Sequence, residues 1–134
     1  MAELAEFVHR GAAKITPQIL RGVYKKLPML KVEFAQIHAP KFPHLVSQLQ
    51  FLANVVEDFA EDKAEDLSYF AAASACYAII YAQRQWDLIP DSVPDVGLAD
   101  DSGVVRVVLI EHERALSKYA QKIGMTWRAI SVDA

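Results

Sequence analysis

The sequence predicts an all-α fold, a small helical bundle of about five helices, and three observations lead to this prediction. Apolar residues recur at spacings of three and four along most of the chain, which is the period of a helix that buries one face. The six prolines fall mainly between these segments or at their starts, where a missing backbone donor is tolerated. Alternation with a period of two is limited to VVRVVLI, residues 104–110, and that run continues a helical pattern.

Two helices are expected at the start of the chain. The first covers Ala2 to Ala13, and the second opens at Thr16-Pro17, because threonine is a favourable N-cap and proline suits the first helical position. Pro28 is expected to break or bend the second helix, since proline removes a backbone donor and clashes with the preceding turn. Four cationic residues at offsets of three, four or seven predict a basic face here: Arg10, Lys14, Arg21 and Lys25.

A third helix is expected from Pro43 to Phe59, closed by the polar run EDFAEDKAED. The next segment, residues 67–83, contains no charge and six alanines. It is too short and too rich in alanine for a membrane span, which needs about 20 strongly apolar residues. Small side chains let helices approach closely, so we place this segment at the centre of the bundle. Cys76 within it is expected to be an unreactive core residue.

A rigid loop rich in proline and aspartate is expected next, over DLIPDSVPDVGLADD at residues 87–101. The stretch contains five aspartates, two prolines, one glycine and no basic residue. Pro90 and Pro94 restrict the backbone and so give the neighbouring aspartates fixed directions. Gly97 is expected to supply a conformation that other residues avoid.

The last long helix is expected from about Ser102 to Lys122, because apolar residues and His112 recur there at helical spacing. Asp100 or Asp101 is the expected N-cap, where a carboxylate accepts from backbone amides. Gly124 is expected to end this helix, and Trp127 and Ile130 are expected to fold back as a short tail.

The loop also resembles a known family. Asp87-Leu88-Ile89-Pro90-Asp91, with Pro94, Gly97 and Asp100-Asp101, is similar to the motif of the YkvA-like proteins, domain of unknown function 1232. That motif reads D-L-I-P-D-x-x-P-x-x-G-x-x-D-D after an apolar helix, and the resemblance covers about residues 67–108. It implies a small bacterial helical protein without an established activity, often suspected of membrane association. The chain departs from the family pattern at residues 84–86, where Arg-Gln-Trp replaces the usual Ser-Pro pair.

Three interpretations of the five aspartates stay open. As metal ligands they would hold Mg²⁺ or Ca²⁺, because hard cations take carboxylate oxygens, with His112 or Glu111 as an extra ligand. As structural residues they would cap helix ends and pair with Arg84 or Arg106. As surface residues they would bind a partner. The spacing matches neither an EF-hand nor a D-D-x-x-D site. The aspartates concerned are Asp87, Asp91, Asp95, Asp100 and Asp101.

Charge is distributed unevenly along the chain. Residues 1–42 hold seven Lys/Arg against three Asp/Glu, a balance of +4, whereas residues 43–134 hold seven against fourteen, a balance of −7. A surface so poor in cations displaces few counterions from nucleic acid, so we expect no nucleic-acid partner. The single cysteine and the acidic start MAELAEF favour a cytoplasmic location, peripheral at the inner membrane if the basic face meets anionic lipid.

The sequence therefore predicts one helical domain, residues 1–134, that is not an enzyme. Its expected role is that of an interaction module that contacts a protein or an anionic membrane surface. The alternative is a metal-binding protein or a metal-dependent enzyme that uses the aspartate-rich loop.

Overall fold

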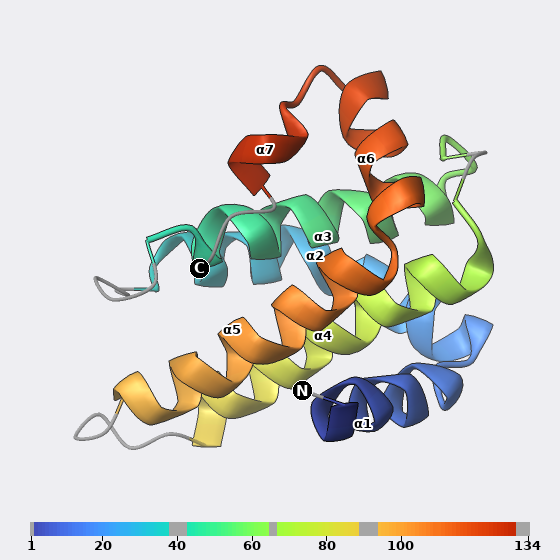
Figure 1. Cartoon of the computed structure of the whole chain (residues 1–134). Helices are drawn as coiled ribbons and strands as arrows, with labels where there is room; N and C mark the ends of the chain where they lie inside the picture. The colour runs from blue at the N-terminus through green and yellow to red at the C-terminus, as the bar shows by residue number, and fades with distance from the viewer. Residues whose placement is uncertain (1, 38–42, 65–66, 89–93, 131–134) are drawn as a thin grey trace.

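The computed structural model describes residues 2–37, 43–64, 67–88 and 94–130, without side chains for residues 2, 84–88 and 94–101. The secondary structure in these ranges is entirely helical, so the all-α prediction is confirmed (Figure 1). The predicted number of about five helices is too low. The described ranges contain seven helices: α1 (Ala2–Ala13), α2 (Pro17–Ala35), α3 (Leu45–Ala60), α4 (Tyr69–Leu88), α5 (Pro94–Glu111), α6 (Glu113–Lys122) and α7 (Trp127–Ile130).

The start of α2 follows the prediction. The Oγ1 atom of Thr16 accepts a hydrogen bond from the backbone amide of Ile19 at 3.1 Å, and Pro17 is the first helical residue. Pro28 does not break the helix, which runs as one element from Pro17 to Ala35. Pro28 is exposed to solvent, so water can hydrogen-bond to the carbonyl that its ring leaves without a donor.

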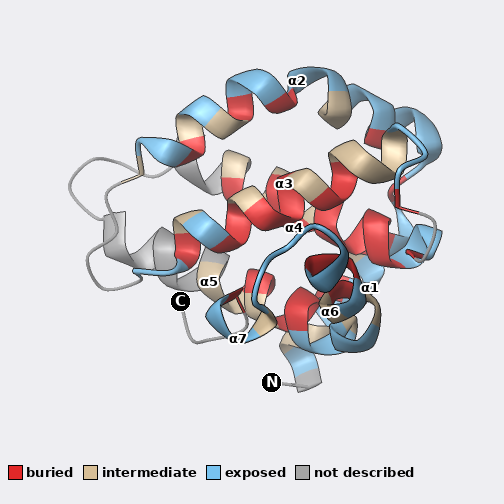
Figure 2. Ribbon diagram, turned by 90° about the horizontal axis from the view of Figure 1, so that it is seen from above, coloured by how far each residue is buried: buried red, intermediate tan, exposed pale blue. Residues whose placement is uncertain are grey.

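Helix α4 lies at the centre of the bundle, as predicted, and contacts α1, α2, α3 and α5 (Figure 1). Most of its buried side chains are alanines, and Cys76 and Ile79 are also buried. Small side chains permit this close packing on several sides at once. Figure 2 shows buried residues along α3 and α4, while the outer side of α2 is exposed. No helix in the described part of the chain is both long enough and apolar enough to span a membrane.

The predicted last helix is divided into two. Helix α5 ends at Glu111, and α6 begins at Glu113, with His112 between them at φ −115° and ψ 28°. The change of direction brings α6 and α7 over α3 (Figure 1). Leu116 and Tyr119 are buried as a result, and the ring of Tyr119 lies 5.7 Å from that of Phe51. Burial of these side chains favours the break over a straight continuation.

The ends of α3 and α6 have the same cap geometry. After α6, the amide of Gly124 donates to the carbonyl of Gln121, the amide of Met125 donates to that of Ala120, and Gly124 has φ 80°. This is a Schellman motif, and it confirms the predicted end at Gly124. After α3, Asp62 occupies the equivalent position with φ 59°, although it carries a side chain. The predicted polar end of the third helix is therefore confirmed.

Candidate functional site

The structure revises the predicted aspartate loop. The backbone of Asp87 is in α4, and α5 begins at Pro94, so residues 94–101 are helical and not part of a loop. The expectation that Asp100 or Asp101 caps the last helix is wrong, because both lie well inside α5. Gly97 also lies within this helix, where no unusual backbone conformation is required.

The metal-ligand hypothesis for the aspartates remains a prediction. Asp91 and Pro90 lie outside the described residues, as do the side chains of Asp87, Asp95, Asp100 and Asp101. Among the side chains that the structure does describe, no group of three or more His, Cys, Asp or Glu could hold a metal ion. His112, the suggested extra ligand, has a different partner.

His112 belongs to a cluster in which α1, α4 and the α5–α6 junction meet. Its Nε2 atom lies 3.0 Å from the Oγ atom of Ser74, which is buried. Its ring lies 5.5 Å from the ring of Phe70, and the ring of His9 lies 5.9 Å from Phe70. His9 in turn forms an ion pair with Glu111 at 3.2 Å if its imidazole is protonated. We call these five residues the histidine cluster.

Burial lowers the pKa of His112 below its ordinary value of 6.5, because desolvation disfavours the charged imidazolium. The charge of Glu111 raises this pKa, whereas His9 lowers it, as burial does. Burial therefore favours the neutral form of the ring beside Ser74. Ser74 is 1% exposed, so its hydroxyl is closed to a substrate, and the pair has a structural role.

Carboxylates at the C-terminal end of α3 form hydrogen bonds with tyrosines and an ion pair with a lysine. The hydroxyl of Tyr119 donates to the Oδ2 atom of Asp58 at 2.6 Å, and that of Tyr24 donates to the Oε2 atom of Glu61 at the same distance. Lys31 pairs with Glu57 at 3.2 Å. The bond to Glu61 raises the pKa of Tyr24 and lowers that of Glu61. These interactions hold α2 and α6 against α3.

Cys76 is a core residue, as predicted. It is fully buried in α4 and forms no disulfide, and burial raises the pKa of its thiol to about 12. A thiol that stays protonated at neutral pH is a poor nucleophile.

The predicted basic face is divided between two helices. Arg10 lies on α1 and Lys14 in the turn after it, whereas Arg21 and Lys25 lie on α2. The cause is the turn before Thr16, where the amides of Lys14 and Ile15 bond back to α1 and end it. The four cations therefore do not form one helical row.

The outer side of α2 combines cations with large apolar side chains. Arg21, Lys25, Met29 and Val32 follow one another at offsets of four, four and three, and all four are exposed. We call these four residues the α2 outer face. Met29 is 52% exposed and Val32 59%, so two large apolar side chains face solvent in the same row as the two cations. Among the described residues, no acidic side chain forms an ion pair with Arg21 or Lys25.

Comparison of this chain with family models, with curated proteins and with solved structures finds no match. The surface of the molecule therefore supplies the functional argument.

Two features of the structure were not predicted from the sequence: the apolar part of the α2 outer face and the histidine cluster. Met29 and Val32 continue the row of Arg21 and Lys25, and their spacing already places them on the polar side of α2. The histidine cluster unites residues from distant parts of the chain, so no local pattern indicates it.

Proposed function

We propose that this protein is a non-catalytic module that binds an anionic membrane surface through the α2 outer face. The observation that carries the proposal is the exposure of Met29 and Val32 in the same helical row as two cations, Arg21 and Lys25. The main apolar face of α2 is buried in the bundle, so only Met29 and Val32 would insert below the headgroups, while the two cations meet anionic lipid. Residues 87–101 resemble the motif of the YkvA-like family, and the suspected membrane association of that family supports the proposal.

Electrostatics favour one orientation of the molecule on such a surface. A lysine or arginine near an anionic leaflet contributes about 1 kcal/mol at low screening. Lys26 adds a third exposed cation beside the α2 outer face, and Glu33 is the only acidic residue of the helix. The chain as a whole carries a net charge of −3, so a local cluster of cations is needed to attract it to an anionic surface.

Co-sedimentation with vesicles tests the proposal. The wild-type chain is expected to sediment with vesicles that contain phosphatidylglycerol and to stay in the supernatant with pure phosphatidylcholine. The double variant Arg21→Glu plus Lys25→Glu is expected to lose this binding, because it replaces two attracted charges by two repelled ones. Raising the salt concentration is expected to weaken wild-type binding in the same assay.

A matched variant separates position from net charge. Lys118 and Lys122 are exposed on α6 at the same offset of four. Lys118→Glu plus Lys122→Glu makes the same change in net charge and is expected to retain binding. Equal loss in both double variants would show that only overall charge matters, and would contradict a specific role for the α2 outer face.

A further inference from the structure

A hollow of about 500 Å³ opens between α1, α4 and the start of α2. Volumes of roughly 300–1,000 Å³ are typical of small-molecule sites. We call it the α1–α4 groove, and its lining residues are Phe7, Arg10, Gly11, Lys14, Ile15, Ile19, Tyr77 and Ile80. Most of the lining is aliphatic, aromatic or glycine, and the α2 outer face contributes no residue to it.

Aromatic rings form one wall of the groove. The ring centroid of Phe7 lies 6.1 Å from that of Tyr77 and 6.0 Å from that of Tyr81, both edge to face. Phe7 remains 45% exposed, and Ile19 at the start of α2 is 43% exposed. Two large apolar side chains therefore stay in contact with water at the groove, a cost that a bound apolar chain would remove.

The groove has a fixed shape because its walls are tied together. The hydroxyl of Tyr69 on α4 donates to the backbone carbonyl of Ile15 at 2.7 Å, which holds the turn between α1 and α2 against α4. The Thr16 cap fixes the first turn of α2, which carries Ile19. A site that is already formed loses less conformational entropy on binding than one that must assemble.

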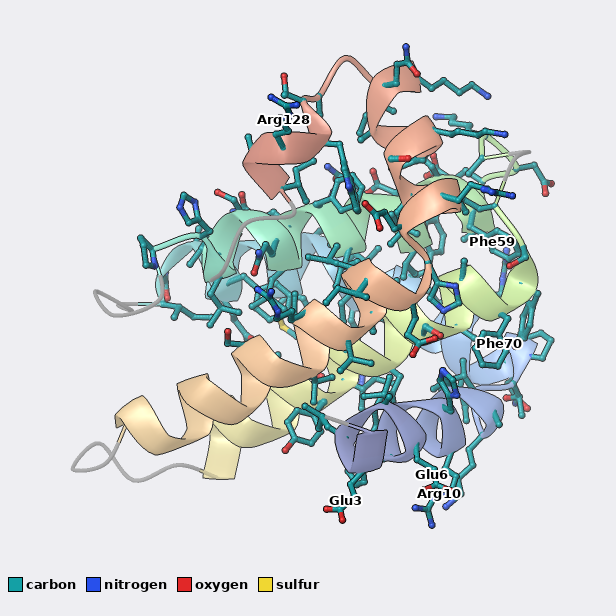
Figure 3. The ribbon with its side chains drawn as sticks, viewed as in Figure 1. Glu3, Glu6, Arg10, Phe59, Phe70 and Arg128 are labelled. Atoms are coloured by element: carbon teal, nitrogen blue, oxygen red, sulfur yellow. The ribbon has the colours of Figure 1, made fainter. Side chains whose placement is uncertain are left out.

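The charged side chains that line the groove, among the described residues, are the two cations Arg10 and Lys14. Glu6 lies beside Arg10, with its Oε2 atom 4.0 Å from the Nη2 atom of Arg10 and both side chains 72% exposed (Figure 3). An ion pair so long and so solvated is weak, so Arg10 can still attract an anion.

We propose that the α1–α4 groove binds a free single-chain amphiphile with an anionic head, of which a fatty carboxylate is the simplest case. The hydrocarbon chain lies against Phe7, Ile19 and Ile80, and the carboxylate meets Arg10 and Lys14. This site is separate from the α2 outer face, so the inference does not depend on membrane binding.

Titration with dodecanoate, below its critical micelle concentration, is the direct test. Calorimetry is expected to show saturable binding, and amide NMR signals of Gly11, Tyr77 and Ile80 are expected to move. Dodecyltrimethylammonium has the same chain with a cationic head, and we expect it to bind at least about tenfold more weakly. Equal affinity for the two amphiphiles, or signal changes confined to other helices, would overturn the proposal.

Two variants with matched controls locate the site. Ile19→Glu places a carboxylate in the groove and is expected to abolish dodecanoate binding. Gln18→Glu puts the same charge on the neighbouring exposed position, which does not line the groove, and is expected to bind like the wild type. Both changes add an acid to the first turn of α2, which the helix dipole tolerates, and circular dichroism confirms that each variant is folded.

The second variant is Arg10→Gln plus Lys14→Gln, whose exposed side chains can change without disturbing the core. It is expected to weaken dodecanoate binding about tenfold while vesicle binding persists. Arg21→Gln plus Lys25→Gln is expected to weaken vesicle binding while dodecanoate binding persists. If only phosphatidylglycerol vesicles bind, and Ile19→Glu prevents that, the occupant is a membrane lipid and the proposal of a free amphiphile fails.

Discussion

The ring of Tyr77 on α4 occupies the place where any residue other than glycine at position 11 would put its Cβ atom. Gly11 lies inside α1, where glycine has a low helix propensity. The close approach of α4 is the reason that a glycine fits here. Both Gly11 and Tyr77 line the α1–α4 groove.

Gly11→Ala is expected to destabilise the protein. The added methyl group must displace the Tyr77 ring, which is packed against Phe7 and Tyr81, and such overpacking costs about 1–3 kcal/mol. Gly22→Ala is the matched control, because Gly22 lies in α2 with nothing within 4 Å of an added Cβ. It should raise the free energy of unfolding by about 0.5–1 kcal/mol. Urea denaturation measures both, and a gain in both variants would show that Tyr77 moves freely.

Tyr119→Phe is expected to lower the free energy of unfolding by about 1–2 kcal/mol. The change removes the hydrogen bond to Asp58 and leaves a partly buried carboxylate without this donor. Tyr24→Phe removes a bond of equal length to Glu61 at the surface, where water can replace the lost hydroxyl. A much smaller change is expected there in the same denaturation experiment. Equal effects would mean that burial does not decide the strength of these bonds.

Stability is expected to fall as the pH drops below about 6.5, the ordinary pKa of histidine. The pKa of folded His112 is lower than this value, so the unfolded chain takes up the proton first as the pH falls. Each step of acidification through this window then favours the unfolded state. The loss stops growing below the pKa of folded His112. Denaturation midpoints measured from pH 8 to pH 5 should show the decline.

His112→Asn is expected to flatten that pH profile, because asparagine does not titrate in this range. His9→Asn serves as the control, since His9 is solvent-exposed and faces the same Phe70 ring. A decline that persists in the His112 variant would show that burial of the neutral His112 ring is not its cause.

The caps at Asp62 and Gly124 are expected to respond in opposite ways to substitution. Gly124→Ala forces a side chain into the left-handed region and should cost about 1 kcal/mol. Asp62→Gly relieves that strain at the end of α3 and should leave stability unchanged or raised. Thermal melts of the two variants provide the comparison. A strong loss for Asp62→Gly would show that its carboxylate has a further role.

Thermal melts in EDTA, Mg²⁺, Ca²⁺ and Mn²⁺ are expected to coincide if the aspartates of residues 87–101 are structural. A metal present at 100 times its dissociation constant would add about 2.7 kcal/mol and raise the melting temperature by several degrees. Such a shift would favour the metal-binding alternative over our proposed function.

Local signals in the sequence predicted those elements whose ends depend on nearby residues. The Thr16 cap, Pro17 at the helix start and the glycine at position 124 act within a few residues, and the structure has each where expected. The central place of α4 also followed from its alanines, because small side chains are required wherever several helices pack on one.

Features decided by distant contacts were not predicted. The break at His112 depends on the space beside α3 for Leu116 and Tyr119, and the pattern of α5 continues through it. The N-cap proposed at Asp100 or Asp101 failed because a proline can itself begin a helix, as Pro94 does. The α1–α4 groove likewise depends on the placement of α4 against the turn at Ile15.

The division of the last helix at His112 has a consequence for how the molecule opens. Two hydrogen bonds hold α6 and α7 to α3: the Tyr119 hydroxyl donates to Asp58, and the Nε2 atom of Gln48 donates to the carbonyl of Ile130 at 2.9 Å. Helices α6 and α7 can detach together while α5 stays packed on α4. Amide hydrogens of α6 and α7 should then exchange with deuterium as one cooperative group, sooner than those of the central helices.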